Sequence, residues 1–105
     1  MEKHEVELLP AAYADLDEIF DYILLDNPHA AAKMLDDIMQ ALRRLEDFPL
    51  SGAPFPDHSL KEFNFRMVVV EPYLAFYRFI DNKVYVYRVL HGTRNYLNLL
   101  RKELT

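Results

Sequence analysis

Few residues in this sequence have the types and spacing that chemistry requires. The four histidines, His4, His29, His58 and His91, lie far apart, and none of their spacings matches the histidine pairs that bind zinc from one helix. The chain has no cysteine, which excludes disulfides, thiolate metal ligands and cysteine nucleophiles. We therefore expect no metal site and no cofactor.

His91 is the histidine with the most suggestive surroundings. It ends a predicted strand, Gly92 follows it directly, and Arg94 lies three residues further on. Imidazole titrates near neutral pH, so a general acid or base could occupy this position. The alternative interpretation is a hydrogen-bonded histidine at the edge of the core, without a chemical role.

Three arginines mark the sides of predicted strands that can reach solvent. Arg66, Arg78 and Arg88 each alternate with apolar residues on a different strand. If they share one face of a sheet, their guanidinium groups lie beside aromatic rings, which suits phosphates, carboxylates or bases. The alternative is three solitary arginines, each with its aliphatic stem along an apolar strand. The separation of the guanidinium groups, compared with a Debye length of about 8–10 Å, distinguishes the two.

Hydrophobic periodicity predicts the elements that carry these residues. Alternation predicts a strand over 3–9, and a helical period predicts helices over 11–25 and from Pro28 to about Asp47. The short link at Asp26-Asn27-Pro28 favours an antiparallel helical hairpin. The apolar stripe of the second helix is also compatible with a short coiled-coil seam. Residues 48–56 contain three prolines and a glycine, so we expect a loop without regular structure.

Three further strands are predicted between residues 61 and 91. The last two are Tyr73–Ile80 and Val84–His91, joined by a tight turn at Asp81-Asn82. Thr93 to Leu104 reads as a helical or irregular tail. The expected fold class is therefore α+β, with an N-terminal strand and a helical hairpin packed on one face of an antiparallel C-terminal β-meander. The other sheet face is expected to stay open and to offer a binding surface.

Length and composition indicate one globular domain over residues 1–105. The acidic, polar start Met1–Glu5 is unlike a signal peptide, no apolar run could span a membrane, and the absence of cysteine fits a reducing cytoplasm. The net charge of −5 divides unevenly: residues 1–48 hold 12 acids and 4 bases (−8), and residues 49–105 hold 5 and 8 (+3). This asymmetry suggests an anionic partner for the second half, unless helices are simply more acidic than strands here.

The order and spacing of several segments resemble the RelE/ParE superfamily, the toxins of bacterial type II toxin–antitoxin modules. These segments are Ala11–Ile19, Phe48-Pro49-x-x-Gly52, Phe65–Val68, Tyr73–Arg78 and Arg88–Arg94. The resemblance implies a helical hairpin on an antiparallel sheet. RelE-like members cut mRNA in the ribosomal A site without a metal, whereas ParE-like members poison DNA gyrase. An antitoxin, whose C-terminal segment wraps the toxin, neutralises both and is the expected partner in a shared oligomer.

The resemblance also implies candidate site residues. For a nuclease these are Arg66, His91, Arg94 and Tyr96, with Leu100 at the position of the family's terminal catalytic tyrosine. For binding a target or the antitoxin they are Arg66, Arg78, Arg88 and Arg94.

Three features of the sequence favour the ParE-like branch, and the first is Leu100 at the position of the family's terminal catalytic tyrosine. The nucleases carry an arginine at the position of Leu74, and leucine cannot stabilise a phosphorane-like charge. The net charge of −5 also opposes docking on ribosomal RNA. We therefore expect inhibition of DNA gyrase by protein binding, without enzymatic activity. The alternatives are a ribosome-dependent mRNA endoribonuclease, acting on ribosome and mRNA, and a degenerate toxin that only binds its antitoxin.

Overall fold

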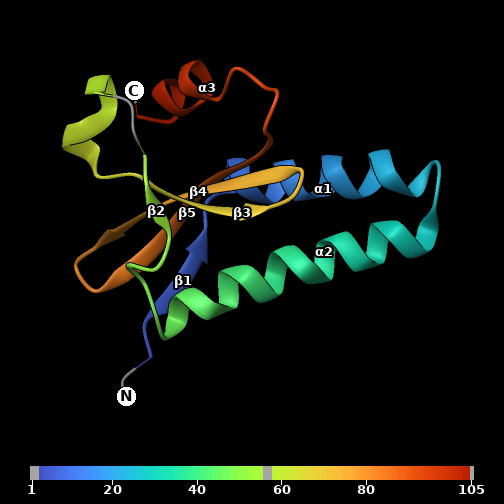
Figure 1. The fold of residues 1–105 in the computed structure, drawn as a ribbon, viewed down its shortest axis with the longest axis horizontal. Coiled ribbons are helices and arrows are strands. Elements are labelled where there is room, and N and C mark those ends of the chain that lie inside the picture. Colours follow the sequence, from blue (N-terminus) through green and yellow to red (C-terminus); the bar gives the residue numbers. More distant parts are fainter. Residues whose placement is uncertain (1–2, 56–57, 105) are drawn as a thin grey trace.

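A five-stranded sheet organises the molecule, and helices lie on both of its faces (Figure 1). The computed structural model describes residues 3–55 and 58–104, except the side chains of residues 58 and 59. The strands run in the order β1-β5-β4-β3-β2, with β1 parallel to β5 and the other neighbours antiparallel. Their bounds are β1 Glu5–Leu8, β2 Ala53–Pro54, β3 Arg66–Val70, β4 Tyr73–Ile80 and β5 Lys83–His91. The predictions for Met1, Glu2 and Pro56 lie outside the described residues.

The predicted helical hairpin is confirmed. Helices α1 (Pro10–Leu24) and α2 (Pro28–Arg43) lie side by side and are joined by a tight turn (Figure 1). Each helix begins with a proline, whose missing N–H costs nothing in a first turn. The Asn27 side chain caps α2 by accepting a hydrogen bond from the Ala30 amide. A 3₁₀ turn, η1 (Arg44–Glu46), then extends α2.

The hairpin covers one face of the sheet and builds the main core with it. Tyr73, Ala75 and Tyr77 of β4 lie on this face, as the alternation of β4 predicts. The stripe of α2 packs here as well, through Ile38, Leu42 and Leu45. The stripe is therefore an intramolecular contact and not a coiled-coil seam.

The other sheet face is not open, so that expectation is wrong. The 3₁₀ helix η2 (His58–Phe63) and helix α3 (Tyr96–Glu103) cover it (Figure 1). They form a second hydrophobic cluster of the buried residues Leu60, Phe65, Phe76, Leu90 and Leu100. This face is covered because β4 also presents the apolar side chains of Leu74 and Phe76 here, and these must be buried like the apolar side chains on the hairpin face.

Two local predictions also need correction. Ala53–Pro54 forms strand β2 inside the segment where a loop is predicted, because proline is tolerated on an edge strand. Residues 61–63 belong to η2 rather than to a strand. The turn prediction holds, since Asp81 and Asn82 adopt φ angles of 51° and 64°. Among the described residues, no helix combines the length and apolar character needed to cross a bilayer.

Candidate functional site

The end of β5 and the turn after it bring His91 and Arg94 together. Both line a hollow of about 410 Å³ that α1 closes on one side through Asp15, Glu18 and Tyr22. Tyr73 supplies a further wall, and burial raises the pKa of its phenol. This hollow thus unites two of the residues that the sequence singles out.

His91 is oriented by its own turn. Its Nδ1 accepts a hydrogen bond from the Thr93 backbone N–H at 3.1 Å and lies 2.8 Å from the Thr93 hydroxyl. Its ring meets Tyr73 edge to face, with 5.6 Å between centroids. A backbone N–H can only donate to a lone pair, so the neutral ring carries its proton on Nε2. His91 is therefore a half-buried, hydrogen-bonded residue at the edge of the core.

Arg94 is the most accessible of the candidate arginines. Its backbone N–H donates to the His91 carbonyl, which fixes the turn. Its side chain is exposed, and no hydrogen-bond or ionic partner for its guanidinium group is found within residues 3–55 and 58–104. This group is therefore available to an external carboxylate or phosphate.

Arg66 lies away from the His91–Arg94 hollow. Arg66 pairs with Tyr77 of β4, whereas His91 pairs with Tyr73, so about 13 Å of strand separates the two positions. The Arg66 Nη1 donates to the carbonyl oxygens of Leu50 and Gly52, at 3.1 and 2.8 Å. None of the described hollows is lined by both Arg66 and Arg94.

Arg78 lies on the face that η2 and α3 cover. Its Nε donates to the Phe63 carbonyl at 2.6 Å, and its Nη1 donates to the Tyr87 hydroxyl at 3.1 Å. The guanidinium carbon lies 5.5–5.8 Å from the centroids of Phe63, Phe65 and Tyr87. Arg78 is thus held by cation–π contacts inside the fold.

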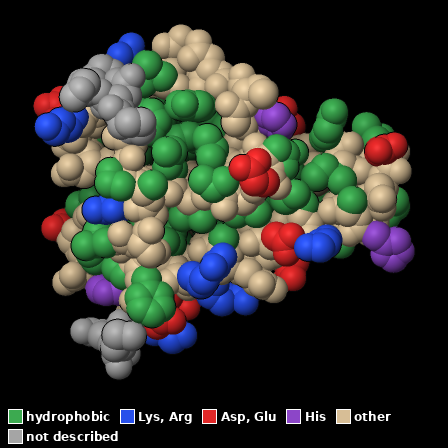
Figure 2. Space-filling view, in the orientation of Figure 1, with side chains coloured by type: hydrophobic (Ala, Val, Ile, Leu, Met, Phe, Trp, Pro, Cys, Tyr) green, Lys and Arg blue, Asp and Glu red, His purple; other side chains and the backbone are tan. Residues whose placement is uncertain are grey.

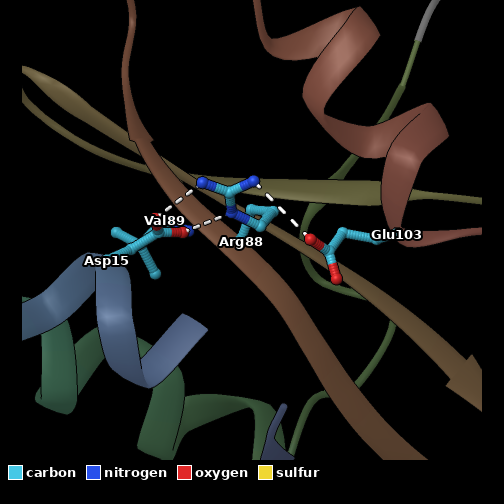
Figure 3. A network of polar contacts seen from close by, with 4 residues as sticks. All are labelled: Asp15, Arg88, Val89 and Glu103. Atoms are coloured by element: carbon cyan, nitrogen blue, oxygen red, sulfur yellow. Dashed lines mark hydrogen bonds and ion pairs between the residues drawn. The ribbon is translucent and has the colours of Figure 1, made fainter. Parts of the chain in front are cut away.

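Arg88 forms a bidentate ion pair with Asp15 (Figure 3). Its Nε and Nη2 donate to the two carboxylate oxygens at 2.7 and 2.8 Å, and Glu103 of α3 lies 3.7 Å from Nη1. The hydrogen bond to Asp15 raises the pKa of Arg88. Asp15 also accepts the Val89 backbone N–H at 2.9 Å, which β1 leaves unpaired because it ends at Leu8. This network joins α1, β5 and α3.

The hypothesis of one open, arginine-lined face is therefore wrong, and the three arginines are not solitary either, because each guanidinium group binds partners inside the fold. Arg66 pairs with Tyr77 and lies on the hairpin side, whereas Arg78 and Arg88 lie on the side of the second hydrophobic cluster, where Arg88 pairs with Phe76. The β3–β4 register explains the failure, because Arg66 lies opposite Tyr77, whereas Arg78 belongs to the other alternating set of β4. A bulge between Phe76 and Tyr77 also inserts an extra residue in β5, so Arg88 lies on the opposite face from Val84 and Val86, with which alternation groups it.

Tyr96 is also separate from His91 and Arg94. Its ring packs against Phe55 and Phe76 in the second hydrophobic cluster, with centroids 5.9 and 5.2 Å away. Leu100, which the resemblance aligns with a catalytic tyrosine, is fully buried. Leu74 packs in the same cluster.

Sequence reasoning missed Asp15 and Tyr77. Asp15 lies three residues after Ala12 and four before Ile19, on the buried stripe of α1, and that spacing was the available signal. Tyr77 reads as an ordinary core residue, yet its hydroxyl donates to Pro49 and accepts from Gly52. No cluster of three or more possible metal ligands occurs among the described side chains.

Comparison with known proteins gives consistent relationships. The family model of the ParE toxin of the type II toxin–antitoxin system parDE matches residues 6–96. A protein described as a candidate toxin, Y4kP of Sinorhizobium fredii, is 32% identical over 101 residues, covering 95% of this chain and 100% of that protein.

Two solved structures share the fold. One comes from the chromosomal ParDE system of P. aeruginosa, with a TM-score of 0.71 and 24% identity, covering 85% of this chain and 96% of that one. The other comes from the toxin–antitoxin complex RelBE2 of Mycobacterium tuberculosis, with a TM-score of 0.59 and 22% identity, covering 85% and 98%. On the match over residues 6–96, this chain belongs to the ParE family of toxins of type II toxin–antitoxin systems.

Proposed function

We propose that this ParE-family toxin inhibits DNA gyrase by binding it, without enzymatic activity, and that a cognate antitoxin neutralises it. The proposal rests on one observation: the candidate nuclease residues do not lie together in one site. Arg66 is bound to loop carbonyls, Tyr96 is packed in a hydrophobic cluster, and only His91 and Arg94 share a hollow.

Dispersal matters because metal-free RNA cleavage needs several groups around one phosphate. A base must reach the 2′-hydroxyl within about 2.6–3.2 Å, and a cation must meet the charge that develops on the phosphate. Arg66 lies about 13 Å of strand away from His91, too far for the two to act on one phosphate. The chemistry therefore favours a toxin that acts through protein contacts.

Of the four arginines that the sequence proposes for binding a target or an antitoxin, Arg94 is the best placed. Arg66, Arg78 and Arg88 each bind internal partners. Arg94 is exposed beside the aromatic rings of Tyr73 and Tyr22. We assign Arg94 the role of contacting a carboxylate or phosphate of the target complex.

An antitoxin partner is supported by the exposed apolar surface. Tyr13, Tyr22, Leu24 and Leu25 of the hairpin are 41–91% exposed, and Phe48, Leu50 and Val69 are 54–58% exposed. Hydrophobic side chains also occupy much of the centre of the molecular face in Figure 2. Large exposed apolar groups of this kind mark interaction sites. The related chains in the ParDE system and the RelBE2 complex come from such partnerships.

The test uses the full chain with gyrase and supercoiled plasmid. Wild-type protein should convert plasmid into gyrase-linked linear DNA, and Arg94→Ala should weaken this effect by about tenfold or more. Arg43→Ala, which removes an exposed charge from the other end of the hairpin, is the matched control and should act like wild type.

A parallel assay with translating ribosomes addresses the alternatives. Cuts in A-site mRNA that disappear with Arg66→Ala or Arg94→Ala would establish the endoribonuclease instead. That activity is the second candidate function because His91 and Arg94 line one hollow. If the wild-type chain neither poisons gyrase nor cuts mRNA but still binds its antitoxin, it is a degenerate toxin.

A further inference from the structure

The hollow beside His91 presents two opposite charges to solvent. Arg94 lines it from the turn after β5, and Glu18 lines it from α1. Both side chains are exposed, and neither forms an ion pair with another residue in the described part of the chain. The hydrogen bond to Asp15 is the main reason that the pKa of Arg88 is raised, and the charge of Glu18 adds only a minor contribution. Glu18 is therefore available, like Arg94, to meet a charge from outside.

The side of the hollow that α1 forms is acidic throughout. Helix α1 holds the carboxylates of Asp15, Asp17, Glu18 and Asp21 and contains no lysine or arginine. Of these four carboxylates, only Asp15 forms an ion pair with a described residue. A nucleic-acid strand carries a negative charge at every phosphate, so binding at Arg94 would bring further phosphates toward this acidic helix. The charge of the hollow therefore disfavours nucleic acid, although one phosphate alone suits Arg94.

The rest of the lining is apolar and aromatic. Ile19, Pro72 and the rings of Tyr22 and Tyr73 contribute to a volume of about 410 Å³. Tyr22 is 74% exposed, so its ring offers a face to a ligand. The neutral His91 ring, whose proton is on Nε2, adds a hydrogen-bond donor. Such a lining suits long charged side chains, whose aliphatic stems pack on rings while their charged ends find partners.

We propose that this hollow binds a protein segment of gyrase, in which an acidic side chain meets Arg94 and a basic side chain meets Glu18. The exposed ring of Tyr22 also favours the basic side chain through a cation–π contact. This inference rests on the proposed inhibition of gyrase. It selects a carboxylate of the target protein, rather than a phosphate of its DNA, as the group that Arg94 contacts.

The first test reverses the charge of Glu18 and measures the binding of the full chain to gyrase without DNA. Glu18→Lys should weaken binding by about tenfold or more, because the basic side chain of the target then meets a like charge. Asp17→Lys makes the same charge change at an exposed position of α1 outside the hollow, and it should stay within about threefold of wild type. A phosphate ligand predicts the opposite sign, since Glu18→Lys would replace a repulsion by an attraction.

The second test uses milder variants, which keep the shape of each side chain and remove only its charge. Glu18→Gln and Arg94→Gln should each weaken binding to gyrase by about threefold or more. Added salt should weaken the wild-type complex more than that of the double variant, because the two charge pairs are then absent. Thermal melting of every free variant verifies that it is folded.

The outcomes separate this inference from the proposed function. If the wild-type chain poisons gyrase but binds it only when DNA is present, the inference is overturned and gyrase inhibition stands. The same holds if Glu18→Lys binds within about threefold of wild type or more tightly, or if Asp17→Lys weakens binding equally.

A further outcome concerns the antitoxin. If Glu18→Lys and Arg94→Gln weaken only the complex with the product of the neighbouring open reading frame, the hollow belongs to the antitoxin and the inference is overturned. Failure of the wild-type chain either to bind or to poison gyrase would contradict the proposed function, and the inference with it.

Discussion

At the scale of single residues, Asp15 is unusual because it is a buried carboxylate with both a side-chain and a backbone partner. Its side chain is only 8% exposed, and it serves both the Arg88 guanidinium and the Val89 backbone N–H. Burying a charge is costly unless its hydrogen bonds are satisfied, and here three short bonds satisfy it. Asp15 thereby completes the edge of β5 where β1 stops.

Removal of this carboxylate should be strongly destabilising. Asp15→Ala leaves the Arg88 charge and the Val89 N–H buried without their partner, so the free energy of unfolding should fall by about 3–5 kcal/mol in urea titrations. Asp17→Ala, on the exposed side of the same helix, should change it by less than about 0.5 kcal/mol. Equal small effects for both variants would contradict the structural role of Asp15.

At the scale of elements, most of the fold could be predicted from local pattern. The two helices and strands β4 and β5 follow from hydrophobic periodicity, from the prolines that open α1 and α2, and from the Asp81-Asn82 turn. These signals lie within each element, so they can be read without knowing what packs against it. The short strand β2 carries no such signal, because only its pairing with β3 defines it.

The site was less predictable, because its geometry depends on relations between elements. The bulge beside Tyr87 shifts β5 against β4, and alternation within either strand does not reveal it. Similarly, Asp15 meets Arg88 only because β1 ends at Leu8. The pairing of His91 with Arg94 is the exception, since three residues of one turn connect them.

Helix α3 tests the finding that both sheet faces are covered. Leu100 is fully buried between α3 and the sheet, so Leu100→Ala should leave a cavity and lower the free energy of unfolding by about 2–5 kcal/mol. Asn98→Ala changes an exposed position of the same helix and should have little effect in the same urea titration. A loss below about 0.5 kcal/mol for Leu100→Ala would indicate that α3 contributes no core.

At the scale of the whole molecule, the two halves of the chain differ in the sign of their charge and in how far their charged side chains are buried. The hairpin half holds most of the acids, and its carboxylates other than Asp15 lie largely at the surface. The sheet half holds most of the bases, and three of its arginines are engaged inside the fold. The positive sum of that half therefore overstates the cationic surface that it offers a partner, and Arg94 is its accessible cation at the hollow beside His91.

Stability of the whole molecule should decline in alkali, because three groups titrate in the same direction. Burial raises the pKa values of Tyr73 and Tyr77, and hydrogen bonds to Glu5 and Glu7 raise that of Lys83. The unfolded chain then loses protons first, near the ordinary values of 10.0 for tyrosine and 10.5 for lysine. The folded state binds more protons there, so the free energy of unfolding is fully retained below about pH 10 and falls as pH rises further.

The Tyr77→Phe variant isolates one part of this alkaline loss. At about pH 8 it should be less stable than wild type by about 1–3 kcal/mol, because the Gly52 N–H and the Pro49 carbonyl lose their buried partner. Above about pH 10 its stability should fall less steeply, since no phenol remains at this position to ionise on unfolding. Urea titrations across this range measure both effects, and Tyr13→Phe, at an exposed position, should keep the wild-type slope. A Tyr77→Phe slope identical to wild type would show that the alkaline loss arises at other groups.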